Sequence, residues 1–277
     1  MASMTRPAGP VLIVGAVTWD VFGGERRPGG AVSFAARAAA ALGVRARILT
    51  ISGADADLAA FEGHEVHVIP SQSTLTFEHE VHGEQRRLRV LARPERALAA
   101  TDIPRGWLDS RAVVLGPLLA DDVDVASFVA VGFERVGLIG QGLQRVLDGN
   151  GVVTEEQSAS RVLVAALSPR CSLFLSEEEC GPWGRGELDA VVGACERVVV
   201  TRGAAGARVL RAGHEPVGVA ATPAPVVDTT GAGDVFATAF FLGVSVLGLG
   251  EVEAGALASR LAASKVGLVG AVELPRV

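Results

Sequence analysis

The sequence predicts an α/β fold in which helices cover both faces of a doubly wound, mostly parallel sheet, with a small β-hairpin as a lid. Short apolar runs rich in β-branched residues alternate with helical or loop segments, as is typical of parallel strands covered on both faces. One further stretch alternates apolar and polar residues instead. With 277 residues, 49% of them hydrophobic, we expect a single domain over 1–277 with a lid formed mainly by 72–92.

The chain opens with a strand, a helix and a second strand. Residues 11–17 (VLIVGAV) form a continuous apolar run, the pattern of a buried parallel strand. After a Pro- and Gly-rich break, residues 31–43 (AVSFAARAAAALG) predict a helix that ends at Gly43, and residues 45–52 predict the next strand. This order is that of a βαβ unit.

A hairpin is predicted over residues 75–91. Apolar and polar residues alternate in LTFEHEVH, the pattern breaks at His82-Gly83-Glu84, and it resumes in RRLRVL. Such alternation leaves one face of the hairpin in water. We therefore expect it to stand apart from the main sheet as a lid.

The remaining segments complete the sheet and its cover. Further apolar strands are expected at 112–115, 135–139, 172–175 and 197–201, with helices or loops between them. Two strands at 207–211 and 216–220, joined through a turn at Gly213, predict an antiparallel edge. Two helices, from about 233 to 249 and from about 252 to 268, close the chain.

Composition argues against several classes of protein. The net charge is −6, from 25 basic and 31 acidic residues, and no stripe of arginines alternates with aromatic residues, so nucleic acid is not an expected partner. The longest apolar run, 235–250, is about 16 residues, short of the roughly 18 of a membrane span. Cys171, Cys180 and Cys195 lack metal-site spacing, and no apolar segment of a secretory signal precedes the first strand, so a reduced, cytoplasmic chain is expected.

The most informative segment is 228–234 (DTTGAGD), directly before an apolar helix. A Gly-rich turn at the start of a helix leaves backbone N–H groups unpaired at the positive end of the helix dipole, which favours an anion. Gly231 and Gly233 allow phosphate oxygens to come close to the amides. Asp234 would repel the anion but could accept the proton of an incoming hydroxyl group, as in phosphoryl transfer. The alternative is that residues 228–230 merely cap a core helix.

DTTGAGD resembles the signature of the ribokinase/PfkB family of carbohydrate kinases, and other landmarks follow in the family's order. Residues 15–20 (GAVTWD) are similar to its GxxxxD strand end, and residues 29–31 to its glycine pair below the substrate. Residues 200–207 (VTRGAAGA) resemble its nucleotide-side turn, and the late helix ending in Gly270-Ala271 resembles the segment beside the adenine. The resemblance covers nearly the whole chain and implies a ribokinase-like fold.

The resemblance also implies roles for the matched residues. Asp234 would be the general base, and the amides of Gly231, Ala232 and Gly233 would form an anion hole. The acceptor would be a sugar or polyol hydroxyl group and the donor ATP with Mg²⁺, while participation of a monovalent cation stays open. The implied substrate residues are Asp20, Gly29, Gly30 and Asp234, and the implied nucleotide residues are Thr201, Gly203, Thr230, Gly231, Gly233, Ser259 and Ala262.

The sequence departs from the family pattern at two places. The family often carries Asn-x-x-Glu near the magnesium ion, where this chain reads Ser176-Glu177-Glu178-Glu179, so Glu179 alone would act there, through water. Only about eight residues separate Asp20 from Gly29, which is consistent with a reduced lid. A reduced lid makes pairing between lids less favourable, so we expect a monomer or weak homodimer.

These departures resemble the plant myo-inositol kinase branch of the family. That branch shares the compressed first loop, a GGAxSF string as in residues 29–34, and Ser-Glu-Glu in place of the asparagine motif. Residues 140–145 (GQGLQR) are similar to its QGxxR segment. The resemblance therefore implies a cyclitol such as myo-inositol as the acceptor.

Three alternatives remain. A nucleoside or ketose kinase of the same family would suit the same scaffold, with Trp19 and Phe34 as parts of an aromatic clamp for a nucleoside. A ligand-binding relative without catalysis would account for Ser176 and the short lid, although Asp234 argues against it. A dinucleotide-binding dehydrogenase is disfavoured because GxGxxG does not follow the first strand.

Overall fold

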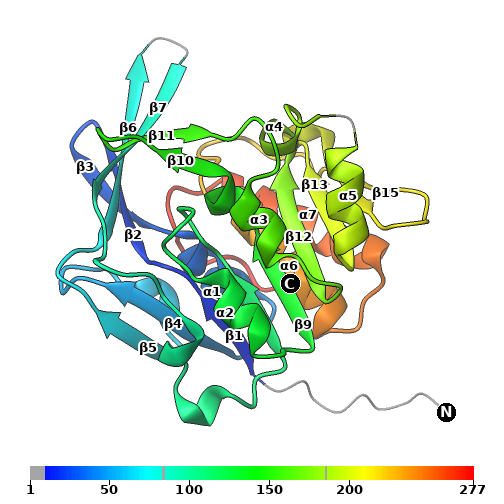
Figure 1. Cartoon of the computed structure of the whole chain (residues 1–277), viewed down its shortest axis with the longest axis horizontal. Helices are drawn as coiled ribbons and strands as arrows, with labels where there is room; N and C mark the ends of the chain where they lie inside the picture. The colour runs from blue at the N-terminus through cyan, green and yellow to red at the C-terminus, as the bar shows by residue number, and fades with distance from the viewer. Residues whose placement is uncertain (1–9, 83–84, 185) are drawn as a thin grey trace.

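The computed structural model describes residues 10–82, 85–184 and 186–277, which contain two sheets (Figure 1). The larger sheet has nine strands in the order β15-β14-β13-β12-β9-β8-β1-β4-β5. All residues of β1, β4 and β8 are buried, and β1 and β8 are apolar throughout, as expected of strands covered on both faces. The strands are β1 (Val11–Val14), β4 (Ala46–Ser52), β5 (Glu65–Pro70), β8 (Ala112–Leu115), β9 (Arg135–Ile139), β12 (Cys171–Ser176), β13 (Arg197–Thr201), β14 (Ala207–Leu210) and β15 (Val217–Val219).

The larger sheet is parallel except at one edge. β1 pairs in parallel with β4 and β8, and the strands from β8 through β9 and β12 to β13 are also parallel. β14 and β15 form the predicted antiparallel edge. The chain runs outward from β1 through β4 to β5 and then returns to β8 on the other side of β1, which confirms the doubly wound topology. In such sheets ligands bind beyond the carboxyl ends of the strands, near the point where the winding reverses.

The smaller sheet is broader than the predicted hairpin. The hairpin itself is confirmed as β6 and β7, which project beyond the larger sheet in Figure 1, while its turn at 83–84 lies outside the described residues. β2 pairs with β6 and β11 pairs with β7, so a lid formed mainly by 72–92 is wrong in extent. The order is β10-β11-β7-β6-β2-β3, and the strands are β2 (Thr18–Phe22), β3 (Glu25–Gly29), β6 (Leu75–His82), β7 (Gln85–Ala92), β10 (Arg145–Leu147) and β11 (Val152–Glu155).

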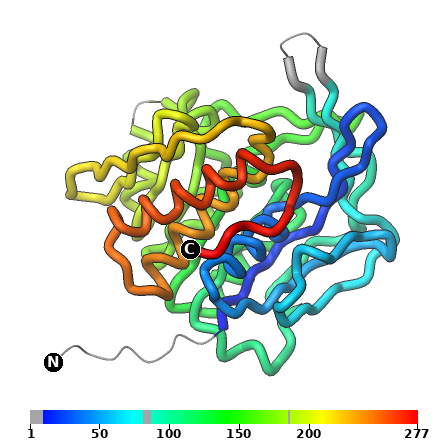
Figure 2. The backbone as a smooth tube through the Cα atoms, turned by 180° about the vertical axis from the view of Figure 1, so that it is seen from behind, coloured from blue at the N-terminus to red at the C-terminus, as the bar shows by residue number. Residues whose placement is uncertain are grey.

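Helices cover both faces of the larger sheet, as predicted. Figures 1 and 2, drawn from opposite sides, place α1, α6 and α7 on one face and α2, α3 and α5 on the other. No helix in the described ranges is long and apolar enough to cross a membrane. The helices are α1 (Ala31–Ala41), α2 (Val125–Ala130), α3 (Arg161–Ala166), α4 (Glu177–Cys180), α5 (Glu187–Ala194), α6 (Ala232–Ser245) and α7 (Glu251–Val266), with 3₁₀ turns at Ala59–Phe61, Ala100–Asp102, Arg105–Trp107, Gln141–Gln144 and Gly203–Ala205.

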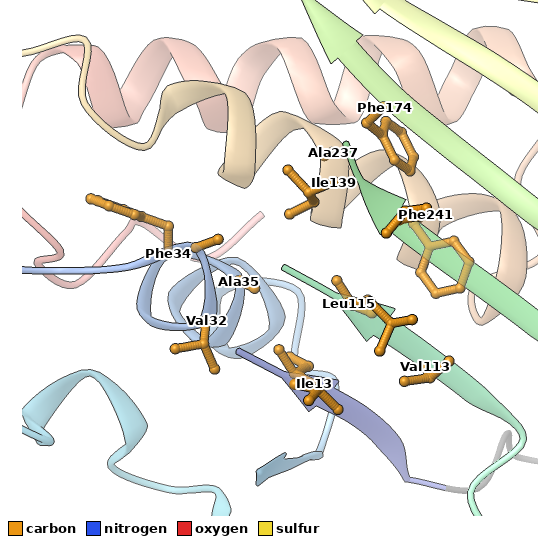
Figure 3. Close-up of a cluster of buried hydrophobic side chains, with 14 of the residues drawn as sticks. Ile13, Val32, Phe34, Ala35, Val113, Leu115, Ile139, Phe174, Ala237 and Phe241 are labelled. Carbon is orange, nitrogen blue, oxygen red and sulfur yellow. The ribbon is translucent and has the colours of Figure 1, made fainter. Parts of the chain in front are cut away.

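The core places α6 firmly against the sheet. Phe241 of α6 is 1% exposed and belongs to the buried cluster that also contains Ile13 and Leu115 of the central strands (Figure 3). A Cβ atom at Gly137 of β9 would lie only 2.9 Å from the Phe241 ring, so the helix approaches β9 because that position has no side chain. The packing of Phe241 against β9 thereby fixes the position of α6, including its first turn.

Candidate active site

The turn before α6 has a conformation that requires glycine. Gly231 is the N-cap of α6 with φ 76°, in the left-handed region. A Cβ atom there would also overlap the ring of Phe34 in α1, which is 3% exposed. The turn therefore lies directly on a buried aromatic ring, which holds its backbone from below.

Three amides at this turn are free to bind an anion. Within the described part of the chain, the N–H groups of Gly231, Gly233 and Asp234 have no hydrogen-bond partner. The amide of Ala232, by contrast, donates to the Thr229 carbonyl oxygen at 3.2 Å. Of the amides predicted to bind an anion, those of Gly231 and Gly233 are therefore available and that of Ala232 is not, while the Asp234 amide is also available.

The capping alternative does not describe this turn. No side chain caps α6. The Asp228 carboxylate accepts instead from the amide of Thr230 at 2.9 Å and from the amide of Gly270 at 3.0 Å, both outside the helix. Asp228 thus orders the loop that leads into the helix and leaves the amides of Gly233 and Asp234 unpaired.

The Asp234 side chain is suited to accept a proton. It lies in the first turn of α6, remains partly accessible to solvent, and makes no hydrogen bond to any described residue. Burial raises the pKa of this carboxyl group to about 6; the positive charge of Arg145 lowers it, and the negative charge of Asp20 raises it further. A carboxylate with a pKa nearer to neutrality is a better base than an exposed aspartate.

Arg145, at the start of β10, brings a positive charge to this carboxylate. Its guanidinium donates to the Leu118 carbonyl oxygen at 3.0 Å and lies 5.7 Å from the Phe77 ring centroid. Burial lowers the pKa of Arg145, while nearby carboxylates, first among them Glu179, favour its charged form. The sequence singled out this arginine only as part of the GQGLQR string, because its charge acts on Asp234, a residue far away in the chain.

Glu179 is oriented by hydrogen bonds within residues 176–179, the segment that stands in place of the asparagine motif. Ser176 and Glu179 form a capping box at the start of α4: the Ser176 amide donates to Glu179 Oε2 at 2.9 Å, and the Glu179 amide donates to Ser176 Oγ at 3.2 Å. Glu179 is only 6% exposed, and burial raises its pKa to about 7. Its second oxygen, Oε1, makes no hydrogen bond to a described residue.

Asp20, predicted at a strand end, lies within β2 and is 7% exposed. Its carboxylate hydrogen-bonds His79 Nε2 of β6 at 3.1 Å, a partner that sequence reasoning missed because the alternating pattern around His79 indicates only a strand. A Cβ atom at Gly29 would overlap the Asp20 carboxylate, and one at Gly30 would lie 2.5 Å from the Ala16 carbonyl oxygen. The glycine pair therefore makes room for the aspartate and for the entry into α1.

The predicted nucleotide residues fall into two groups. Thr201 ends β13 opposite Ser176, and Gly203 begins the following 3₁₀ turn, so both lie at the carboxyl edge of the larger sheet. Ser259 is 7% exposed, and its hydroxyl group accepts from the Thr222 amide at 2.7 Å and donates to Thr222 Oγ1 at 3.1 Å. That hydroxyl group is thus occupied within the protein, and the neighbouring predicted residue Ala262 is partly buried.

The comparisons with known proteins point to one family. Residues 176–276 match the pfkB family carbohydrate kinase model. The bifunctional protein HldE of Nitrosococcus oceani is 27% identical over 304 residues, covering 99% of this chain and 58% of HldE. The chain thus spans less than two thirds of that relative.

Solved structures match the fold. A pyrophosphate-dependent kinase in the ribokinase family, complexed with a pyrophosphate analog and myo-inositol, has a TM-score of 0.78 at 18% identity, covering 96% of this chain and 97% of that one. Arabidopsis thaliana ribokinase, complexed with ribose and ATP, has a TM-score of 0.70 at 18% identity, covering 97% and 96%. These structures show a ribokinase-like fold over nearly the whole chain, and residues 176–276 within that fold match the pfkB family carbohydrate kinase model.

Proposed function

We propose that the chain transfers the γ-phosphoryl group of ATP to a hydroxyl group of a sugar or polyol, and that the acceptor is a cyclitol such as myo-inositol. The observation that carries the proposal is the Asp234 carboxylate, which has no hydrogen-bond partner among the described residues and stands in the same helical turn as the unpaired amides of Gly233 and Asp234. A base and an anion site are thereby adjacent, as phosphoryl transfer to an alcohol requires.

The transfer follows from this arrangement. The acceptor oxygen forms a bond to the γ-phosphorus, the bond from that phosphorus to the β–γ bridging oxygen breaks, and ADP leaves with the electron pair. The acceptor's proton passes to Asp234, which later releases it to water. The free amides at the start of α6 and the helix dipole stabilise the negative charge on the migrating phosphoryl oxygens, and the Arg145 guanidinium limits the repulsion between Asp234 and the phosphates.

A magnesium ion would neutralise the donor's phosphates when bound. Among the described residues, no three His, Cys, Asp or Glu side chains gather as a metal site, so the ion would be bound mainly by phosphate oxygens and water. The free Glu179 Oε1 fits a role as acceptor for one of those waters. Ser176, which stands where the family asparagine would, is occupied in the capping box.

The acceptor would be bound on the side of the smaller sheet. Asp20, oriented by His79, can accept hydrogen bonds from substrate hydroxyl groups, and Gly29 and Gly30 leave space beside it. The proposal of a cyclitol rests on the GGAxSF and QGxxR resemblance and on the neighbour that binds myo-inositol. A nucleoside acceptor has less support, because Phe34 is buried under Gly231 and cannot form a clamp with Trp19, whose ring is covered by Arg26 at 4.4 Å.

Pyrophosphate is a second candidate donor. The Ser259 hydroxyl group, predicted to lie near the base of a nucleotide, is bonded to Thr222 instead. The neighbour that binds myo-inositol is itself dependent on pyrophosphate. With pyrophosphate, the same bond changes at phosphorus would release orthophosphate in place of ADP.

A panel of donors and acceptors tests the proposal. The purified chain is incubated with ATP or pyrophosphate and Mg²⁺ against myo-inositol, ribose, fructose, adenosine and cytidine, and phosphorylated products are identified by mass spectrometry. We expect a phosphate monoester of the cyclitol. Calorimetric binding of an acceptor without any product, under every divalent ion tried, would support the inactive relative instead.

The pH dependence of turnover should report Asp234. Only its ionised form can accept the proton, and its pKa lies at about 6. We expect kcat/KM for the acceptor to fall about tenfold per pH unit below that value and to level off above pH 7. A profile that is flat between pH 5 and 8, measured with enzyme shown to stay folded, would contradict the assignment of Asp234 as the base.

A further inference from the structure

Lys265, the only lysine in the chain, is buried beside the anion-binding turn. It lies in the last turn of α7 and is 1% exposed. Lysine is almost never buried to this extent unless its charge is paired. The groups around its ammonium nitrogen must therefore compensate its charge.

Those groups form a shell of oxygens. Nζ donates to the Leu268 carbonyl oxygen at 2.9 Å and to the Asp228 carbonyl oxygen at 3.3 Å, and it lies 3.6 Å from Asp228 Oδ2. Nζ also lies over the Phe34 ring, 5.6 Å from its centroid. Carbonyl oxygens with one carboxylate and an aromatic face are also the surroundings that a dehydrated monovalent cation prefers.

The same shell holds the turn on which catalysis is proposed to depend. Asp228, which Nζ contacts through two of its oxygens, orders Thr230 and Gly270 through their amides. Phe34, which Nζ also faces, is the ring on which Gly231 lies. One buried positive charge thus contacts both the residue that begins the loop and the ring beneath it.

We propose that Lys265 is a positioning residue whose ammonium group takes the place of a bound monovalent cation beside the anion-binding turn. Phosphoryl transfer by this chain therefore needs no free monovalent cation. The inference rests on the proposed function. Lys265 touches none of the reacting atoms; it acts through Asp228, Leu268 and Phe34. Its ammonium group cannot dissociate from the site as a free ion would.

The test compares cation responses. Initial rates of the full chain are measured in choline chloride and in KCl at equal ionic strength, for the wild type, for Lys265→Met and for Arg260→Met. Arg260 lies on the same helix with an exposed side chain, so its variant controls for loss of a positive charge on α7. We expect equal rates in both salts for the wild type and for Arg260→Met. Lys265→Met should lose about 10- to 100-fold in kcat/KM for the donor in choline and should regain part of it in KCl or NH₄Cl.

Two results would overturn the inference: strong activation of the wild type by K⁺, or full activity of Lys265→Met in choline. If that variant does not fold, the wild-type comparison decides alone, since equal rates support the inference and activation contradicts it. If no acceptor is phosphorylated, the proposed function fails separately. Calorimetric binding of pyrophosphate to the wild type in the two salts then tests Lys265, with equal affinity as the supporting result and K⁺-dependent affinity as the contradicting one.

Discussion

Replacing Asp234 by asparagine should lower turnover by about 10²- to 10⁴-fold, the range typical for loss of a general base. Asparagine keeps the size of the side chain but cannot take the acceptor's proton. Because Asp234 has no hydrogen-bond partner among the described residues, the substitution breaks no hydrogen bond, and donor binding should change little. The measurement is kcat with saturating donor and acceptor, together with donor affinity by calorimetry.

The same substitution should stabilise the fold. Burial raises the pKa of Asp234 from 3.8 to about 6, so ionisation destabilises the folded state. The penalty is absent below about pH 4, grows between pH 4 and 6, and is complete above pH 6. Asparagine removes it, which should add on the order of 1–2 kcal/mol to the free energy of unfolding at pH 7.5, with partial solvent access reducing the value.

Asp189 offers a matched control. It occupies the same position in the first turn of α5 that Asp234 occupies in α6, but its side chain is exposed. Asp189→Asn should leave turnover unchanged and should not stabilise the fold. Near-normal turnover of Asp234→Asn would remove the base from the proposed mechanism, whatever its melting temperature.

The sequence predicts the larger sheet well because burial leaves a local signal. Strands buried on both faces are apolar at most positions, so β1 (VLIV) and β8 (AVVL) can be recognised from their own residues. The helices α6 and α7 are likewise predicted to within a few residues. For these strands and helices, the residues of each segment are enough to predict its secondary structure.

The smaller sheet leaves a weaker signal. β3 contains Pro28 and three charged residues, and β10 has only three residues, so neither resembles a strand in isolation. These segments become strands through pairing with β2 and β11, which the sequence does not specify locally. The extent of this sheet was mispredicted for that reason.

The candidate site divides in the same way. Gly231, Gly233 and Asp234 lie within four residues of sequence and could be predicted from a single string. The approach of Arg145 to Asp234, and of His79 to Asp20, joins elements that only the folded chain brings together. The hydrogen bond from the Ala232 amide to the Thr229 carbonyl oxygen depends on the exact turn conformation, which the string of residues does not specify.

Gly231→Ala should be the most damaging small substitution in the turn. An alanine at φ 76° is strained, and its Cβ atom would overlap the Phe34 ring. Together these effects should lower the free energy of unfolding by about 2–4 kcal/mol. The turn can relieve the overlap only by moving its amides, and a shift of about 1 Å should lower kcat/KM for the donor by about 100-fold.

Gly186→Ala separates strain from overlap. Gly186 is also a helix N-cap in the left-handed region, at φ 88°, but a Cβ atom there would meet no atom within 4 Å. We therefore expect a loss of about 1 kcal/mol in stability and unchanged kinetics. Combining Gly231→Ala with Phe34→Leu should recover part of the donor kcat/KM, since the smaller side chain makes room while the backbone strain persists. Gly231→Ala could instead match Gly186→Ala in both kinetics and stability. The turn would then have accommodated the Cβ atom without any effect on the donor, and the position of the amides at the start of α6 would not control phosphoryl transfer.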